Sequence, residues 1–306
     1  PDFTIANHTN LQSDMNAAEL LKRVRRVEIT TRKLSDRIFT GEYASAFKGR
    51  GMAFAENREY QAGDEVRTID WNVTARTGTP HVKVFEEERE LTVFLLIDMS
   101  ASIQGGTRKR TQRDLLTELS AILAFSAVGN NDKVGAILFT DQIEKFVAPG
   151  KGRSHVLRIV RDIIDCKPQG IGSDVTKALS HFYAAMRKRT VAFLMSDFKH
   201  TNNDVGLETI LKRIGRRHDM VALHLDDPLN HKLPSLGWMR VQDPETGLTR
   251  WRNTSSRRVK REWAQQSSEH RDELAKLMAR SGMDFASVST QESLVKPLLH
   301  VLHARK

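Results

Sequence analysis

The architecture of this chain can be inferred from one apolar run, Leu91-Thr92-Val93-Phe94-Leu95-Leu96-Ile97, which leads directly into Asp98-Met99-Ser100-Ala101-Ser102. The run has the length and composition of a strand that is buried on both faces. A carboxylate and two hydroxyls at alternate positions then follow the strand, at the edge where parallel sheets present ligand-binding residues. Oxygen donors of this kind suit Mg²⁺ or Mn²⁺. Taken alone, D-x-S-x-S is also common in turns, because Asp and Ser side chains hydrogen-bond to nearby backbone.

Further apolar runs of strand length alternate with segments whose apolar residues recur at helical spacing. The expected strands lie at 91–97, 132–139, 190–196 and 220–225, and the expected helices at 112–128, 154–165, 174–189 and 204–216. Such alternation is typical of right-handed βαβ units. It predicts a Rossmann-like α/β fold, in which helices cover both faces of a mostly parallel sheet.

The pattern changes on either side of this region, and the chain divides into four predicted parts. They are a polar tail with an amphipathic helix at 1–37, a β-rich subdomain at 38–90, the α/β domain at 91–226, and a hairpin with helices that complete the fold at 227–306. The turn residues Pro244-Glu245-Thr246-Gly247 predict the hairpin, and Gly282 is placed to end a long charged helix.

Composition narrows the class of protein. The chain has 306 residues, is 39% hydrophobic and carries a formal net charge of +10. A single cysteine, Cys166, excludes an internal disulfide and fits a reducing compartment. No apolar run reaches the ~20 residues of a membrane helix, and the first residues do not form a signal peptide, so a cytoplasmic location is expected. The dispersed basic clusters leave open binding to nucleic acid or to an anionic membrane.

Two later segments add oxygen donors to the same predicted sheet edge. Ser173 lies in the glycine-rich loop Gly170-Ile171-Gly172, and Asp197 follows the strand at 190–196. In order and spacing, the three segments resemble the metal-ion-dependent adhesion site of the von Willebrand factor A family, D-x-S-x-S, then T, then D. The resemblance implies a Mg²⁺ (or Mn²⁺) site formed by these residues: Asp98, Ser100, Ser102, Ser173 and Asp197. Ser173 stands where the family has threonine. A vestigial site, in which these groups only hydrogen-bond to one another, is the alternative.

A second signature precedes the α/β region. Residues 58–78 follow the pattern R-x-Y-x-x-G-D-x-x-R-x-I-D-W-x-x-x-A-R-T-G. In this segment the chain resembles the bacterial family called domain of unknown function fifty-eight, over residues 40–226. The resemblance implies partnership with MoxR-type AAA+ ATPases, as an adaptor or co-chaperone. Arg58 and Arg76 are candidates for partner binding, although an ionic scaffold is the simpler interpretation. We expect Tyr60 and Trp71 to be buried.

Enzyme signatures are absent from the sequence. There is no G-x-S-x-G elbow, no G-x-x-x-x-G-K-[ST] loop and no H-E-x-x-H motif. We therefore expect no catalysis but metal-dependent protein binding, in which the metal accepts a carboxylate from the partner. A metal-assisted phosphoester hydrolase that uses Asp98 and Asp197 is the alternative.

Overall fold

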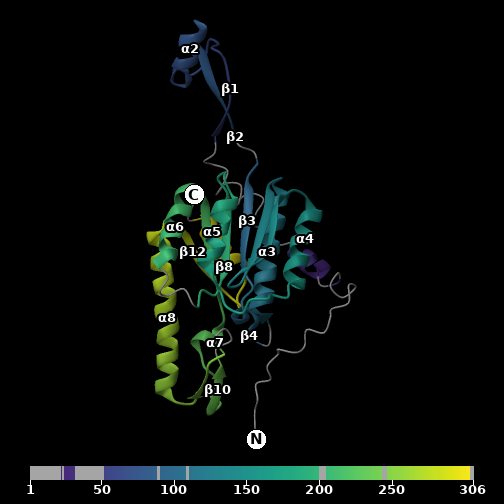
Figure 1. Cartoon of the computed structure of the whole chain (residues 1–306), viewed down its shortest axis with the longest axis vertical. Coiled ribbons are helices and arrows are strands. Elements are labelled where there is room, and N and C mark those ends of the chain that lie inside the picture. Colours follow the sequence, from purple (N-terminus) through teal and green to yellow (C-terminus); the bar gives the residue numbers. More distant parts are fainter. Residues whose placement is uncertain are drawn as a thin grey trace.

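The computed structural model describes residues 22, 24–31, 52–87, 90–107, 110–199, 205–242 and 247–303. Its centre is a six-stranded sheet in the order β12-β9-β8-β3-β6-β7 (Figure 1). The strands are β3 (Thr92–Asp98), β6 (Lys133–Phe139), β7 (Ile143–Gly150), β8 (Val191–Ser196), β9 (Asp219–Asp226) and β12 (Asp284–Ser289). All neighbours pair in parallel except β6 and β7, which are antiparallel.

Helices cover both faces of this sheet, and each face has its own apolar core. One core takes residues of α3 (Gln112–Gly129), α4 (Arg153–Asp165) and α9 (Val295–His303), and the other takes residues of α5 (Val175–Ala185), α6 (Val205–Arg217) and α8 (Arg257–Arg280). Successive residues of β3 alternate between the two, so Val93 and Leu95 join the first core whereas Phe94 joins the second. The expected Rossmann-like, von Willebrand factor A-like fold is confirmed.

Local signals fix the ends of two long helices. At the start of α3, the Thr111 hydroxyl accepts a hydrogen bond from the Asp114 backbone N–H, and the Asp114 carboxylate accepts one from the Thr111 backbone N–H. At the end of α8, Gly282 has φ +72°, as the sequence predicted for a glycine that ends a helix. These signals can be read locally, which explains why the predicted and observed helices agree there.

The N-terminal part contains one antiparallel pair, β1 (Met52–Glu59) and β2 (His81–Glu87), joined through a short 3₁₀ helix, η2 (Val66–Thr68), and the helix α2 (Trp71–Thr77). Figure 1 places these elements beyond the end of the sheet at which β3 begins. The predicted strands are present, but α2 was not predicted. The Asp70 carboxylate caps it by accepting from the backbone of Asn72 and Val73.

Two aromatic residues of this part differ from expectation. Trp71 is 68% exposed and Tyr60 is 37% exposed. The prediction that both are buried was wrong, because α2 is a two-turn helix with no buried residue and does not provide a core for them.

The C-terminal part supplies the predicted hairpin and the edge strand β12. The short helix α7 (Pro228–His231) leads to the hairpin strands β10 (Trp238–Gln242) and β11 (Thr249–Asn253). The loop after β3 forms a 3₁₀ helix, η3 (Ala101–Gln104), and a small ladder of β4 (Gly106–Thr107) and β5 (Arg110–Thr111). Residues 22 and 24–31 are helical, as predicted, whereas the rest of the predicted tail and helix lies outside the described residues. None of the described helices combines the length and apolarity needed to span a bilayer.

Candidate metal centre

The sheet topology brings the predicted metal ligands to one edge. β3 and β8 are neighbours, so Asp98 at the end of β3 lies near Asp197, which follows β8. The loop that carries Ser173 is fastened to the first loop by a hydrogen bond of 3.0 Å from the Ala101 backbone N–H to the Ile171 carbonyl. Three segments that are far apart in sequence therefore meet at the carboxyl edge of the sheet, as predicted for a ligand edge.

Asp98 is the hub of the cluster and is fully buried. Its Oδ2 accepts hydrogen bonds from the hydroxyls of Ser173, at 2.7 Å, and Ser196, at 2.5 Å. Its Oδ1 accepts one from the Ser100 backbone N–H at 2.9 Å. The hydroxyls of Ser100 and Ser102 lie 3.1 Å apart, and both residues are buried. Asp98, Ser100, Ser102 and Ser173 are thus linked in one network of hydrogen bonds.

Asp197 completes the cluster from β8. Its side chain is 1% exposed, and its Oδ2 forms an ion pair with Lys199 Nζ at 3.0 Å. The geometry of this contact is not that of a hydrogen bond, so Oδ2 is buried without a hydrogen-bond partner. The side chain of Lys199 is 36% exposed, so the ion pair with Asp197 lies at the border between the buried cluster and solvent.

Burial, and after it the negative charge of Asp197, raise the pKa of Asp98 to about 6, although the hydrogen bonds from Ser196, Ser100 and Ser173 act in the opposite direction. Two buried carboxylates that repel each other, together with three hydroxyls, form a donor set that fits a small divalent cation. The mutual hydrogen bonds of these groups are also what a vestigial site would show.

A supporting layer holds the Ser173 loop. Glu144 Oε1 accepts hydrogen bonds from the backbone N–H groups of Gln169, at 3.0 Å, and Gly170, at 2.8 Å. A Cβ at Gly170 would lie 1.8 Å from Asp141 Oδ1 and 2.2 Å from Thr140 Oγ1. Only glycine allows this close approach, so the glycine-rich loop predicted around Ser173 has a packing reason as well.

Sequence reasoning missed two members of the cluster, Ser196 and Lys199. Ser196 is the last residue of an apolar strand and was read as part of it, although the strand-end pattern Ser-Asp was visible. Nothing in the sequence pattern indicated that Lys199 pairs with Asp197. In the described part of the chain, no group of three or more His, Cys, Asp or Glu side chains is arranged to hold a metal, so a metal here depends on the hydroxyls.

The two arginines proposed for partner binding lie elsewhere. Arg58 forms a bidentate pair with Asp64, at 2.8 and 2.7 Å, which favours the scaffold interpretation. Arg76 is exposed on α2. Neither belongs to the metal cluster, because β1 and α2 lie at the opposite end of the central sheet in Figure 1.

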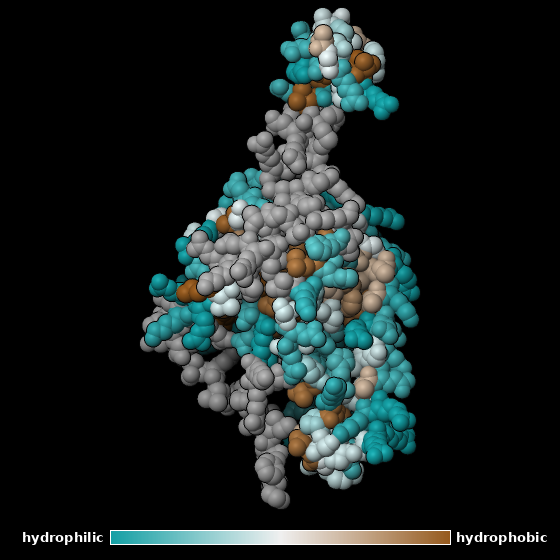
Figure 2. All heavy atoms as spheres, turned by 180° about the vertical axis from the view of Figure 1, so that it is seen from behind, coloured by the Kyte–Doolittle hydropathy of each residue, from teal (hydrophilic) through white to brown (hydrophobic). Residues whose placement is uncertain are grey.

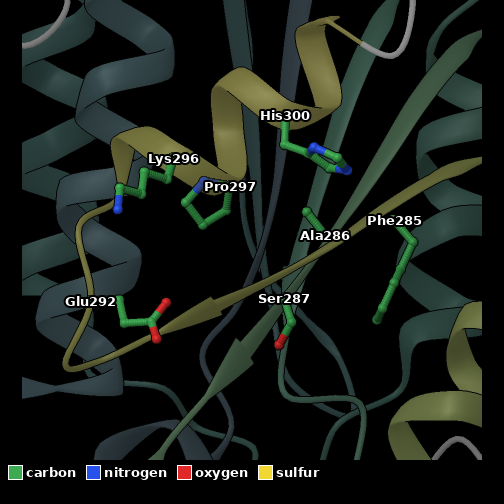
Figure 3. Close-up of a pocket in the computed structure, with 7 residues that line it drawn as sticks. All are labelled: Phe285, Ala286, Ser287, Glu292, Lys296, Pro297 and His300. Atoms are coloured by element: carbon green, nitrogen blue, oxygen red, sulfur yellow. The ribbon is translucent and has the colours of Figure 1, made fainter.

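A separate open cavity of about 460 Å³ lies between β12 and α9 (Figure 3). Ser287 on the strand and Glu292, Lys296 and His300 around the helix give it a polar rim, and Pro297 and Phe285 add apolar surface. None of its lining residues belongs to the metal cluster.

Comparisons with known proteins agree with the second signature. The family described as "Protein of unknown function DUF58" matches residues 56–273. The "Uncharacterized protein Rv1480" of Mycobacterium tuberculosis is 29% identical over 298 residues, which cover 97% of this chain and 93% of the relative.

Among solved structures, BatB from Bacteroides thetaiotaomicron is 14% identical with a TM-score of 0.48, and covers 70% of this chain and 98% of that one. The von Willebrand factor A domain of SpRpn10 is 10% identical with a TM-score of 0.40, and covers 71% and 95%. Because the family match extends over most of the chain, this protein belongs to the DUF58 family.

Proposed function

We propose that this protein is a metal-dependent protein-interaction module, and that Mg²⁺ (or Mn²⁺) joins it to an acidic residue of its partner. One observation carries the proposal. Two buried carboxylates, Asp98 and Asp197, converge with three hydroxyls at the carboxyl edge of the sheet. Buried carboxylates that repel each other favour the binding of a cation, since the cation offsets their desolvation and their mutual repulsion.

The residues that would hold the metal are Asp98, Ser100, Ser102, Ser173 and Asp197. The bound metal would act as a Lewis acid. Because hydroxyl ligands donate little negative charge, the metal would remain electron-poor and could accept a carboxylate from another protein. The chain's own residues set up this position. Ser196 orients Asp98 through the 2.5 Å hydrogen bond, and the Ser173 hydroxyl, which donates to Asp98 in the structure, would provide an oxygen ligand. Lys199 holds Asp197 in an ion pair, which a bound metal would replace.

The partner we propose is a MoxR-type AAA+ ATPase or its client protein, with this chain as adaptor or co-chaperone in the bacterial cytoplasm. The family membership supports this partner, because the resemblance to DUF58 proteins implies it. We propose no catalytic activity. Phosphoester hydrolysis is the alternative, which would use the same two carboxylates.

Calorimetric titration with Mg²⁺ tests the metal site. The heat signal of the wild-type protein should saturate as Mg²⁺ is added. Asp98→Asn should show no binding heat, while its thermal unfolding transition stays that of a folded protein. Asp141→Asn is the matched control, because Asp141 is an exposed acid at the same edge and should not affect the titration. Absence of binding by the wild type would favour the vestigial site. Phosphodiesterase turnover with Mg²⁺ or Mn²⁺ that is lost in Asp197→Ala would favour the hydrolase.

A further inference from the structure

We propose that the exposed face of the hairpin β10–β11 is a second docking surface, which binds an acidic segment of the protein partner next to the metal centre. The inference rests on the proposed function, because it extends the interface that begins at the metal. It assigns a role to a part of the chain that the metal cluster does not use.

The hairpin exposes two large aromatic side chains. Trp238 is 69% exposed and Trp251 is 65% exposed. In the hairpin register Trp238 lies opposite Asn253, and Trp251 lies opposite Arg240. Directly opposed residues share one face of a two-stranded ladder, so both tryptophans and Arg240 lie on the same face as diagonal or direct neighbours. Exposed tryptophans gathered on one face are typical of interaction surfaces rather than of ordinary surface.

The base of the hairpin is held in place. The Thr254 hydroxyl donates to the Gly237 carbonyl at 3.0 Å, and the Thr254 backbone N–H donates to the same carbonyl at 2.8 Å. The Leu236 backbone N–H donates to the Thr254 hydroxyl at 3.1 Å, and Thr254 is buried. These bonds join the two ends of the hairpin to each other, so the tryptophans lie on a closed ladder, which lowers the entropy lost on binding.

The charge around the tryptophans is positive. Between residues 236 and 261 the chain has seven Lys or Arg and two Asp or Glu, and both acids fall between β10 and β11 in the sequence. On the described strands and at the start of α8 the basic residues are Arg240, Arg250, Arg252, Arg257, Arg258, Lys260 and Arg261. Of these, Arg258 is paired with Glu262 at 2.7 Å. The electrostatic complement of this surface is an acidic segment.

The hairpin lies at the same end of the molecule as the metal centre. α7, which leads into the hairpin, contacts β4 in the loop that follows Ser102. Figure 1 shows α7, β10 and β4 together beyond the ends of the parallel strands. In Figure 2 apolar side chains, coloured brown, lie among hydrophilic ones at this end. A partner that places a carboxylate on the metal would thus also reach the hairpin.

These observations favour a protein partner over nucleic acid or membrane. The group that the partner is proposed to place on the metal is a carboxylate, so the partner's surface is acidic there. The adjoining hairpin is basic and therefore has the complementary charge. Tryptophan and arginine are also the residue types that contribute most to protein interfaces. Single-stranded nucleic acid, which stacks on aromatic side chains, and anionic membranes are the competing occupants.

The proposal can be tested by fluorescence anisotropy with a labelled peptide of repeated Glu-Glu-Leu units. The peptide is titrated with the full chain, once in Mg²⁺ and once in EDTA. We expect Trp238→Ala/Trp251→Ala to weaken peptide binding by about tenfold in both buffers. Trp71→Ala is the matched control, because it removes an equally exposed tryptophan at the other end of the molecule. These substitutions leave the net charge unchanged, so purely electrostatic attraction to the basic chain would not respond to them.

The outcomes separate this inference from the proposed function. Unchanged binding by the double tryptophan variant would overturn the hairpin's role, even if Asp98→Asn removed the effect of Mg²⁺. Loss of binding in the double variant without any effect of Mg²⁺ would support the hairpin and contradict the metal bridge. Tighter, tryptophan-dependent binding of oligothymidylate or of phosphatidylserine vesicles than of the peptide would overturn the choice of a protein partner.

Discussion

Lys199 should compete with the metal for Asp197, so we expect Lys199→Met to tighten Mg²⁺ binding. The ammonium lies 3.0 Å from Asp197 Oδ2. In a medium of effective dielectric constant near 20, a pair of unit charges at that distance attracts by about 5 kcal/mol. Because the lysine side chain is 36% exposed, solvent screening reduces the net value to about 1 kcal/mol. Mg²⁺ binding must break this ion pair in the wild type but not in Lys199→Met. The difference of about 1 kcal/mol corresponds to about fivefold tighter Mg²⁺ binding by the variant.

Isothermal titration calorimetry measures the difference directly. Lys145→Met is the matched control. Lys145 forms a similar ion pair with Asp162, with an N–O distance of 2.7 Å, but this pair does not belong to the cluster. The substitution should therefore leave the Mg²⁺ affinity unchanged. The advantage of Lys199→Met should shrink at high salt, which already weakens the ion pair in the wild type. Equal or weaker Mg²⁺ binding by Lys199→Met, in a variant that unfolds at the wild-type temperature, would refute the competition.

Three further predictions concern groups around the cluster and the core. Ser196→Ala should weaken Mg²⁺ binding by about tenfold in the same titration, because Asp98 loses the hydroxyl that orients it; unchanged affinity would mean that Ser196 has no positioning role. Gly170→Ala should lower the free energy of unfolding in urea by about 1–3 kcal/mol, because the new Cβ meets Asp141 and Thr140, and a neutral effect would show that the loop yields. Burial lowers the pKa of His218 to about 4. The unfolded chain therefore takes up a proton between pH 6.5 and 4 that the folded chain resists, and stability falls as pH falls through that window. Between pH 7 and pH 5 the wild type should lose about 1–2 kcal/mol more than His218→Leu, and equal losses would contradict this role for His218.

Much of the fold could be predicted because its signals are local. An apolar run such as 91–97 indicates a buried strand by composition alone, and the Gly282 cap follows from one residue. The position of β12 next to β9 at the edge of the sheet could not be predicted in this way, since pairing order depends on which helices cover which face.

The N-terminal part shows where local signals were misread. The Asp70 carboxylate caps α2, and Gly78 with φ +79° ends that helix, so both ends of a helix that was not predicted carry local signals. Trp71 was expected to be buried because large aromatic residues usually are. Its exposure follows from a helix that packs no core, which composition does not reveal.

Of the candidate site, only the residues that belong to the sequence motif could be predicted. The order D-x-S-x-S, Ser173, Asp197 placed five oxygen donors at one edge, and the structure brings them together around Asp98. The roles of Ser196 and Lys199 depend on the orientation of side chains across two strands. That orientation is a property of the packed sheet and leaves no spacing pattern in the sequence.

Binding to a MoxR-type AAA+ ATPase from the same organism, measured by surface plasmon resonance in Mg²⁺ and again in EDTA, tests the metal bridge most directly. We expect the wild type to bind in Mg²⁺, the binding to be lost in EDTA and in Asp98→Asn, and Asp141→Asn to bind like the wild type. Binding of equal strength in both buffers, or by Asp98→Asn as well as by the wild type, would contradict a bridge through the metal.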